Sequence, residues 1–94
     1  MRIRDVRFAS GVIEKLWRKH SVADYEVQEV FFNQPQFEFA EEGNIEGENL
    51  YTAWGRTDAG RYLIVFFIYK LNRDALVISA RNMTRRERRR YGKK

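Results

Sequence analysis

The stretch RYLIVFFIYK, Arg61 to Lys70, decides the fold, because it is the longest apolar run of the chain. Its apolar residues do not alternate with polar ones, which is typical of a strand whose two faces are both covered. Before it, Asp58-Ala59-Gly60 has the composition of a hairpin turn, with Gly60 suited to a left-handed position. After it, Leu71 to Asp74 predicts a second turn. The stretch is therefore expected to be the central strand of an antiparallel meander.

Three further segments have strand patterns. They are the segment from Gln36, where Phe37 and Phe39 alternate with polar residues, then Asn49 to Arg56, and finally Ala75 to Arg81. The residues from Gly43 to Glu48 read as a loop between the first two. The sequence thus predicts a sheet of about four antiparallel strands.

Helical patterns precede and follow these strands. A core-facing stripe predicts a helix from about Ser10 to Lys19, with Val12, Ile13, Leu16, Trp17 and His20 on its apolar side. Ser21, with Asp24 three residues on, is expected to cap a second helix that ends before Pro35; its apolar positions are Val27, Val30 and Phe31. Thr84 and Glu87 have the spacing of a capping box, which predicts a short C-terminal helix. The fold class is α+β, with two N-terminal helices, the sheet and a short last helix.

Composition limits the function classes. With 94 residues and 44% apolar content, the chain is expected to form a single domain over residues 1–94. The absence of cysteine and the single histidine exclude disulfides and argue against a zinc site, so no metal or cofactor is expected. No apolar run approaches the length that spans a bilayer, and the N-terminus has no signal-peptide pattern. We therefore expect a cytoplasmic protein with no membrane association.

Charge is distributed unevenly. The last fourteen residues hold eight of the eighteen Lys and Arg residues and one acid, Glu87, whereas the first eighty carry a slight negative charge. Between Ser21 and Gly55 there are eight acids and no base. The basic tail is the pattern expected of a protein that contacts phosphate backbones. The acidic segment is expected to orient nucleic acid by repulsion, to dock a basic partner, or only to give solubility.

The end of the chain resembles a known family. Ile78-Ser79-Ala80-Arg81, followed by Thr84 to Tyr91, resembles the closing motif of the BrnT family of bacterial toxins. Lys19-His20-Ser21-Val22 resembles that family's Lys-His-Gly-Val turn, with serine in place of glycine, and Val27 to Asn33 resembles its second helix. The opening differs, because Phe8-Ala9 and Val12 occupy positions where the family often has Trp-Asp and Lys.

The resemblance implies a ribonuclease-toxin fold similar to RelE and metal-independent cleavage of mRNA. It also implies neutralisation by a ribbon-helix-helix antitoxin of the BrnA kind, with operator DNA bound only through that antitoxin. Metal-free cleavage needs a base for the 2′-OH, cations for the phosphorane and an acid for the departing 5′-oxygen.

Candidate catalytic residues follow from that chemistry. His20 exchanges protons near neutral pH, and Lys19 beside it can bind phosphate; the alternative is that His20 only caps the first helix. Arg81 is placed to brace a scissile phosphate, and the alternative is a salt bridge to an acid of the middle segment. Tyr91 is a proton donor or a stacking platform, unless it only packs the last helix. The capping box accounts for Glu87 without catalysis.

Four arginines are candidate RNA-binding residues. Arg56 and Arg61 flank the hairpin turn and are placed to line a cleft, although residues beside turns are usually only solvated. The helical spacing brings Arg81, Arg85 and either Arg88 or Arg89 near one another, and Arg85 and Arg89 are favoured for the RNA backbone. Two function classes remain: an endoribonuclease toxin, and a non-catalytic basic module that binds nucleic acid or protein as a corepressor with a DNA-binding antitoxin.

Overall fold

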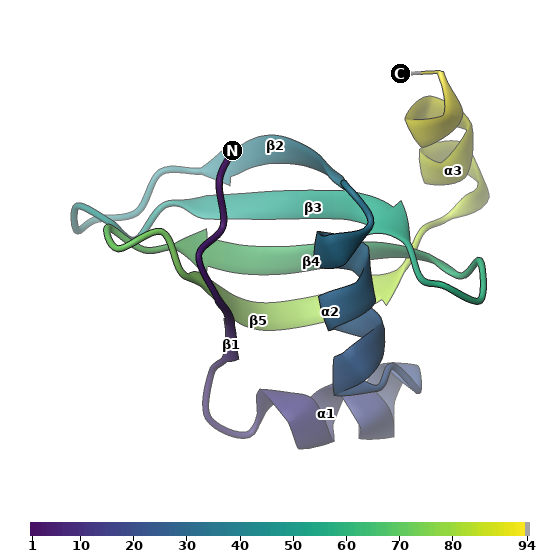
Figure 1. The fold of residues 1–94 in the computed structure, drawn as a ribbon, viewed down its shortest axis with the longest axis horizontal. Helices are drawn as coiled ribbons and strands as arrows, with labels where there is room; N and C mark the ends of the chain where they lie inside the picture. Colours follow the sequence, from purple (N-terminus) through teal and green to yellow (C-terminus); the bar gives the residue numbers. More distant parts are fainter. Residues whose placement is uncertain (94) are drawn as a thin grey trace.

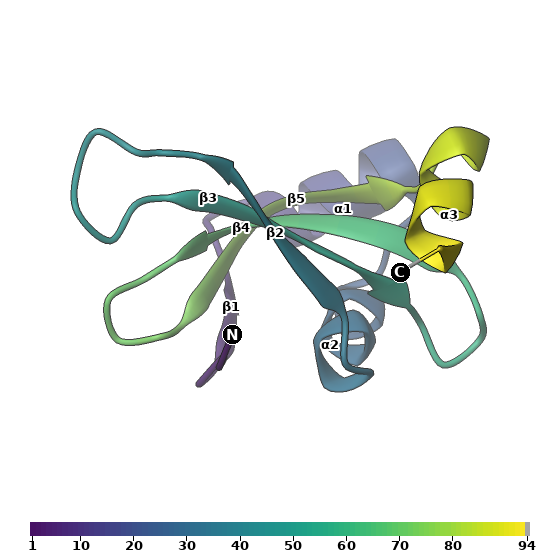
Figure 2. The same ribbon diagram turned by 90° about the horizontal axis from the view of Figure 1, so that it is seen from above.

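The computed structural model describes residues 1–93 and has an α+β fold. Two helices, α1 (Val12–His20) and α2 (Asp24–Phe32), pack on one face of a sheet, and α3 (Arg85–Gly92) lies at one end of the molecule (Figure 1). Seen from above, the strands cross one another because the sheet is twisted, and α3 extends from the end of the last strand (Figure 2). No helix in residues 1–93 combines the length and the hydropathy needed to cross a membrane.

The sheet has five strands. They are β1 (Val6–Phe8), β2 (Gln36–Glu41), β3 (Leu50–Arg56), β4 (Tyr62–Tyr69) and β5 (Ala75–Asn82), in the spatial order β1-β5-β4-β3-β2. The meander from β2 to β5 is antiparallel, as predicted, and β4 is central. The prediction of about four antiparallel strands is wrong at the edge, because β1 adds parallel to β5. Three residues are too short for a periodic signal, and their pairing depends on residues about seventy positions away.

The central strand separates two apolar clusters. Leu63, Val65 and Phe67 of β4 are fully buried beneath α1 and α2. On the opposite face Ile64 packs with Trp54 and Met83. This double burial confirms the prediction from the unbroken apolar run, and the second cluster gives α3 a surface to pack on.

The predicted stripe of α1 is only partly a core stripe. Val12 and Leu16 are buried, whereas Ile13 is 45% and Trp17 64% exposed. The helix packs mainly against β5, near the edge of the sheet, so a narrow side of it is covered.

The turn between α1 and α2 also differs from the prediction. Ser21 ends α1 with a left-handed φ of 52°, and α2 begins at Asp24 after Ala23. The backbone N–H of Ala23 donates to Glu26 Oε1 at 3.0 Å, so Glu26 satisfies the first turn and Ser21 does not cap α2. The hairpin prediction is confirmed, since Gly60 has a φ of 93°.

Candidate nucleic-acid interface

Helix α3 begins at the capping box that the sequence predicts. Thr84 N–H donates to Glu87 Oε1 at 2.8 Å, and Glu87 N–H donates to Thr84 Oγ1 at 3.1 Å. Arg81, near the end of β5, grips the same carboxylate with two hydrogen bonds of 2.8 and 2.9 Å. The bidentate contact with Arg81 is the main reason why the pKa of Glu87 falls to about 2. These contacts fix the angle at which α3 leaves the sheet.

Side chains of α3 also anchor it to the sheet. Tyr91 packs on the cluster around Trp54 and Ile64, and its ring meets that of Tyr62 edge-on, with 6.0 Å between centroids. Arg90 lies over the Trp54 ring at 4.7 Å and forms an ion pair with Glu38 of β2. The helix is therefore held at both of its ends.

Between α3 and the sheet lies a hollow of about 700 Å³, called here the α3 hollow. Its lining includes four arginines and two tyrosines, namely Arg56, Arg85, Arg88, Arg89, Tyr62 and Tyr91. The guanidinium groups of Arg56 and Arg88 lie 4.9 and 4.2 Å from the centre of the Tyr62 ring. Within residues 1–93 none of the four arginines forms an ion pair. The hollow combines unneutralised guanidinium groups with aromatic rings, which is the chemistry that binds phosphates and bases.

Sequence reasoning found part of this set. The structure places the predicted Arg56, Arg85, Arg89 and Tyr91 together in the α3 hollow. The sequence prediction did not include Tyr62, and it named Arg88 only as the alternative to Arg89. Both Arg88 and Arg89 line the hollow, because residues three and four positions after Arg85 lie on the same side of a helix. No local signal marks Tyr62, whose neighbours in the hollow come from β3 and α3.

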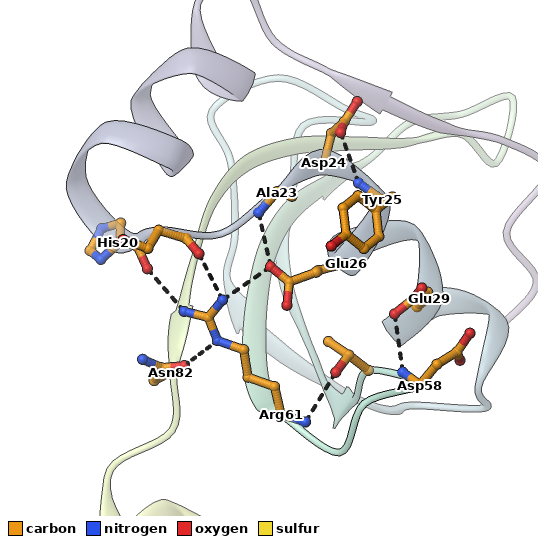
Figure 3. A network of polar contacts seen from close by, with 11 residues as sticks. His20, Ala23, Asp24, Tyr25, Glu26, Glu29, Asp58, Arg61 and Asn82 are labelled. Atoms are coloured by element: carbon orange, nitrogen blue, oxygen red, sulfur yellow. Dashed lines mark hydrogen bonds and ion pairs between the residues drawn. The ribbon is translucent and has the colours of Figure 1, made fainter.

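Arg61 has a different environment (Figure 3). Its side chain donates to the carbonyls of His20 and Ser21 at 2.9 and 2.8 Å. It also donates to Glu26 Oε1 at 3.0 Å and to Asn82 Oδ1 at 2.8 Å. Arg61 therefore joins the end of α1 and the first turn of α2 to the end of β5, and its donors already have protein partners.

Neither His20 nor Arg81 lines the α3 hollow. The carbonyl of His20 accepts from Arg61, and its half-buried imidazole points away from that network (Figure 3). Arg81 lies on the opposite face of β5, with its guanidinium 5.6 Å from the centre of the Phe66 ring. The two candidate catalytic residues His20 and Arg81 thus lie on different sides of the sheet. Lys19, in the last turn of α1, is exposed and does not line the α3 hollow.

The side chains of residues 1–93 include no group of three or more His, Asp or Glu residues placed to hold a metal ion.

Comparison with known proteins identifies a family. The model of the family described as "Ribonuclease toxin, BrnT, of type II toxin-antitoxin system" matches residues 11–87. That segment contains helices α1 and α2, strands β2 to β5 and the start of α3. No curated protein matches the chain.

Proposed function

The chain belongs to the BrnT family of ribonuclease toxins of type II toxin–antitoxin systems, and on this premise we propose that the α3 hollow binds and cleaves RNA. The observation that supports this site is the convergence of Arg56, Arg85, Arg88 and Arg89 without any paired acid in residues 1–93. Phosphate oxygens would supply the missing negative charge. We also propose a RelE-like arrangement, a single toxin domain over residues 1–94 and a cytoplasmic site of action.

The proposed reaction is attack of the ribose 2′-oxygen on the adjacent phosphorus. A bond from O2′ to phosphorus forms as the 2′-hydroxyl gives its proton to solvent water, and the bond from phosphorus to O5′ breaks, leaving a 2′,3′-cyclic phosphate and a 5′-hydroxyl. The arginines of the α3 hollow stabilise the phosphorane, without a metal ion. In this proposal the phenol of Tyr91, a residue that lines the hollow, protonates the departing O5′.

The other candidates have supporting roles in this proposal. Arg81 positions α3 through Glu87, and Arg61 holds the base of α1. His20 and Lys19 do not line the α3 hollow, and Arg61 binds the His20 carbonyl. In this proposal they contact a nucleotide next to the one that occupies the hollow. A protein antitoxin follows from the family, and we propose that it is of the BrnA kind and carries the contact with operator DNA.

One observation favours a second function. No imidazole lines the α3 hollow. Glu87, which lies between the lining residues Arg85 and Arg88 in the chain, is bound to Arg81. A hollow without a general base suits a non-catalytic corepressor that binds nucleic acid together with its antitoxin.

Incubation of the protein with RNA in EDTA separates the two functions. The nuclease produces fragments ending in 2′,3′-cyclic phosphate, and Arg88→Ala/Arg89→Ala abolishes them. Lys15→Ala/Arg18→Ala is the matched control, since it removes two exposed cations of α1 outside the hollow. Intact RNA that is only retarded in a gel would support the corepressor and refute the nuclease. Loss of cleavage in His20→Ala but not in Tyr91→Phe would reassign the proton transfer.

A further inference from the structure

A second basic hollow lies at the end of the sheet away from α3. It has a volume of about 320 Å³ and is lined by Arg2, Ile3, Arg4, Asn72 and Arg73. We call it the N-terminal hollow. Both views show the turn from β4 to β5 at the opposite end from α3, and the N-terminal segment in the half of the molecule away from α3 (Figures 1 and 2). Three of its five lining residues are arginines and none is acidic.

The walls of the N-terminal hollow are fixed by hydrogen bonds. The Arg4 N–H donates to the Arg73 carbonyl at 2.9 Å, and the Tyr69 hydroxyl donates to the Arg2 carbonyl at 2.7 Å. Arg73 has a φ of 72°, a left-handed conformation that costs a non-glycine residue energy, and its N–H donates to the Lys70 carbonyl at 2.9 Å. The backbone that carries the three arginines is therefore fixed before any ligand arrives.

The arginines differ in how far they are neutralised. Asp74 is 1% exposed and accepts two hydrogen bonds from Arg4, at 2.9 and 3.2 Å. Arg2 and Arg73 are exposed and form no ion pair within residues 1–93. Asp74 thus orients one guanidinium and leaves two with open donors.

We propose that the N-terminal hollow is a second binding site for the phosphate backbone of RNA. The inference rests on the proposed function, because that makes RNA the ligand. Guanidinium groups match the geometry of phosphate oxygens, and no lining carboxylate competes for them. The two hollows lie at opposite ends of β4, which spans Tyr62–Tyr69 and is therefore about 25 Å long. Arg2 and Arg4 lie outside the segment that the family model matches.

Strand length distinguishes one site from two. The probe is single-stranded 2′-O-methyl RNA, which has no 2′-OH and stays intact. A strand of about 4 nucleotides fills one hollow, whereas one of about 20 nucleotides reaches both. Arg2→Gln/Arg73→Gln is expected to weaken binding of the long strand about tenfold and to reduce the slope of log K against log salt by about 1.4. Binding of the short strand to the α3 hollow should change less than about twofold.

Two controls complete the experiment. Lys15→Gln/Arg18→Gln removes the same charge from α1 and should leave the binding of both strands unchanged. Arg2→Glu reverses one charge without altering the left-handed residue, so it tests the site even if the double variant unfolds. If Arg2→Glu also binds the long strand as the wild-type protein does, the inference is overturned.

The outcomes separate this inference from the proposed function. Equal effects of Arg2→Gln/Arg73→Gln and Lys15→Gln/Arg18→Gln on the long strand would overturn the N-terminal hollow and leave the α3 hollow in place. Weakening by Arg2→Gln/Arg73→Gln, with no effect of Arg88→Gln/Arg89→Gln, would support the N-terminal hollow and refute the α3 hollow. If Arg2→Gln/Arg73→Gln weakened the binding of polyglutamate but not that of the long RNA strand, the inference would be overturned and the hollow assigned to an acidic protein.

Discussion

Replacement of Arg61 by alanine tests whether this residue is structural. The side chain makes four hydrogen bonds to two backbone carbonyls and to the side chains of Glu26 and Asn82 (Figure 3). The Arg61 side chain is 25% and that of Glu26 15% exposed, so water screens their ion pair only partly. Arg61→Ala leaves the largely buried carboxylate of Glu26 with the Ala23 N–H as its donor but without its cation, and it removes the side-chain donor from two carbonyls.

The loss can be estimated from these exposures. Removing one partner of a buried ion pair costs about 3–5 kcal/mol, and the residual exposure places this pair near about 3 kcal/mol. Stabilities of about 0.05–0.15 kcal/mol per residue give this 94-residue chain about 5–14 kcal/mol, so the variant should still fold. With a urea m-value of about 2 kcal/mol/M, the midpoint should fall by about 1.5 M. Glu26→Gln removes the charge and keeps a hydrogen-bonding group, and should cost about 1 kcal/mol.

Urea unfolding and RNA cleavage, measured on the same variants, distinguish a structural role of Arg61 from an RNA-binding role. We expect Arg61→Ala to lose stability and to cleave RNA within about threefold of the wild-type rate at a temperature where both are folded, because its donors face the protein. Arg61→Lys keeps the charge but loses the forked geometry of the guanidinium, so its stability should lie between those of the wild type and Arg61→Ala. A variant as stable as the wild type, with cleavage reduced by about 10² or more, would refute the structural role and return Arg61 to the RNA-binding set.

Two further predictions concern the ends of helices. The pKa of Glu87 is about 2 when folded and about 4.3 in an unfolded chain, so its contribution is complete above about pH 5 and is lost as the pH falls toward 2. Because the Glu87 side chain is 22% and the Arg81 side chain 37% exposed, we expect the protein to lose about 1–2 kcal/mol of stability over this pH range. The loss should appear as a fall in Tm that Glu87→Gln does not show. Parallel curves of Tm against pH for the two proteins would contradict the prediction. Ser21→Gly should raise the free energy of unfolding by about 0.5 kcal/mol, because glycine adopts the φ of 52° without strain; a loss of stability would contradict this.

Local chemistry made several features predictable. The capping box of Thr84 and Glu87 depends on residues three apart, and the turn at Gly60 depends on one glycine. Both are visible in the sequence and both are confirmed. The unbroken apolar run of β4 likewise predicted its central position. Each signal is carried by neighbours along the chain, so no knowledge of the tertiary structure is required.

Other features depend on contacts between distant segments. β1 exists because Val6 to Phe8 pair with residues of β5. The main partners of Arg61 include two backbone carbonyls at the end of α1, which no residue type encodes. The exposure of Trp17 follows from the position of α1 near the sheet edge. Composition could not separate structural from ligand-binding arginines, because their roles are decided by which acids the fold brings near them.

The distribution of acids shows how the α3 hollow keeps its charge. Of the eight acids in the segment from Ser21 to Gly55, Glu26 pairs with Arg61, Glu38 with Arg90 and Glu48 with Lys70. Glu87, the one acid of α3, is held by Arg81. These carboxylates hold α1, α3 and the strands in place, and none of them lines the α3 hollow. The anchoring of α3 thus depends on acids outside the hollow, and the repulsion among its arginines is relieved only by water, by the ring of Tyr62 or by an anionic ligand.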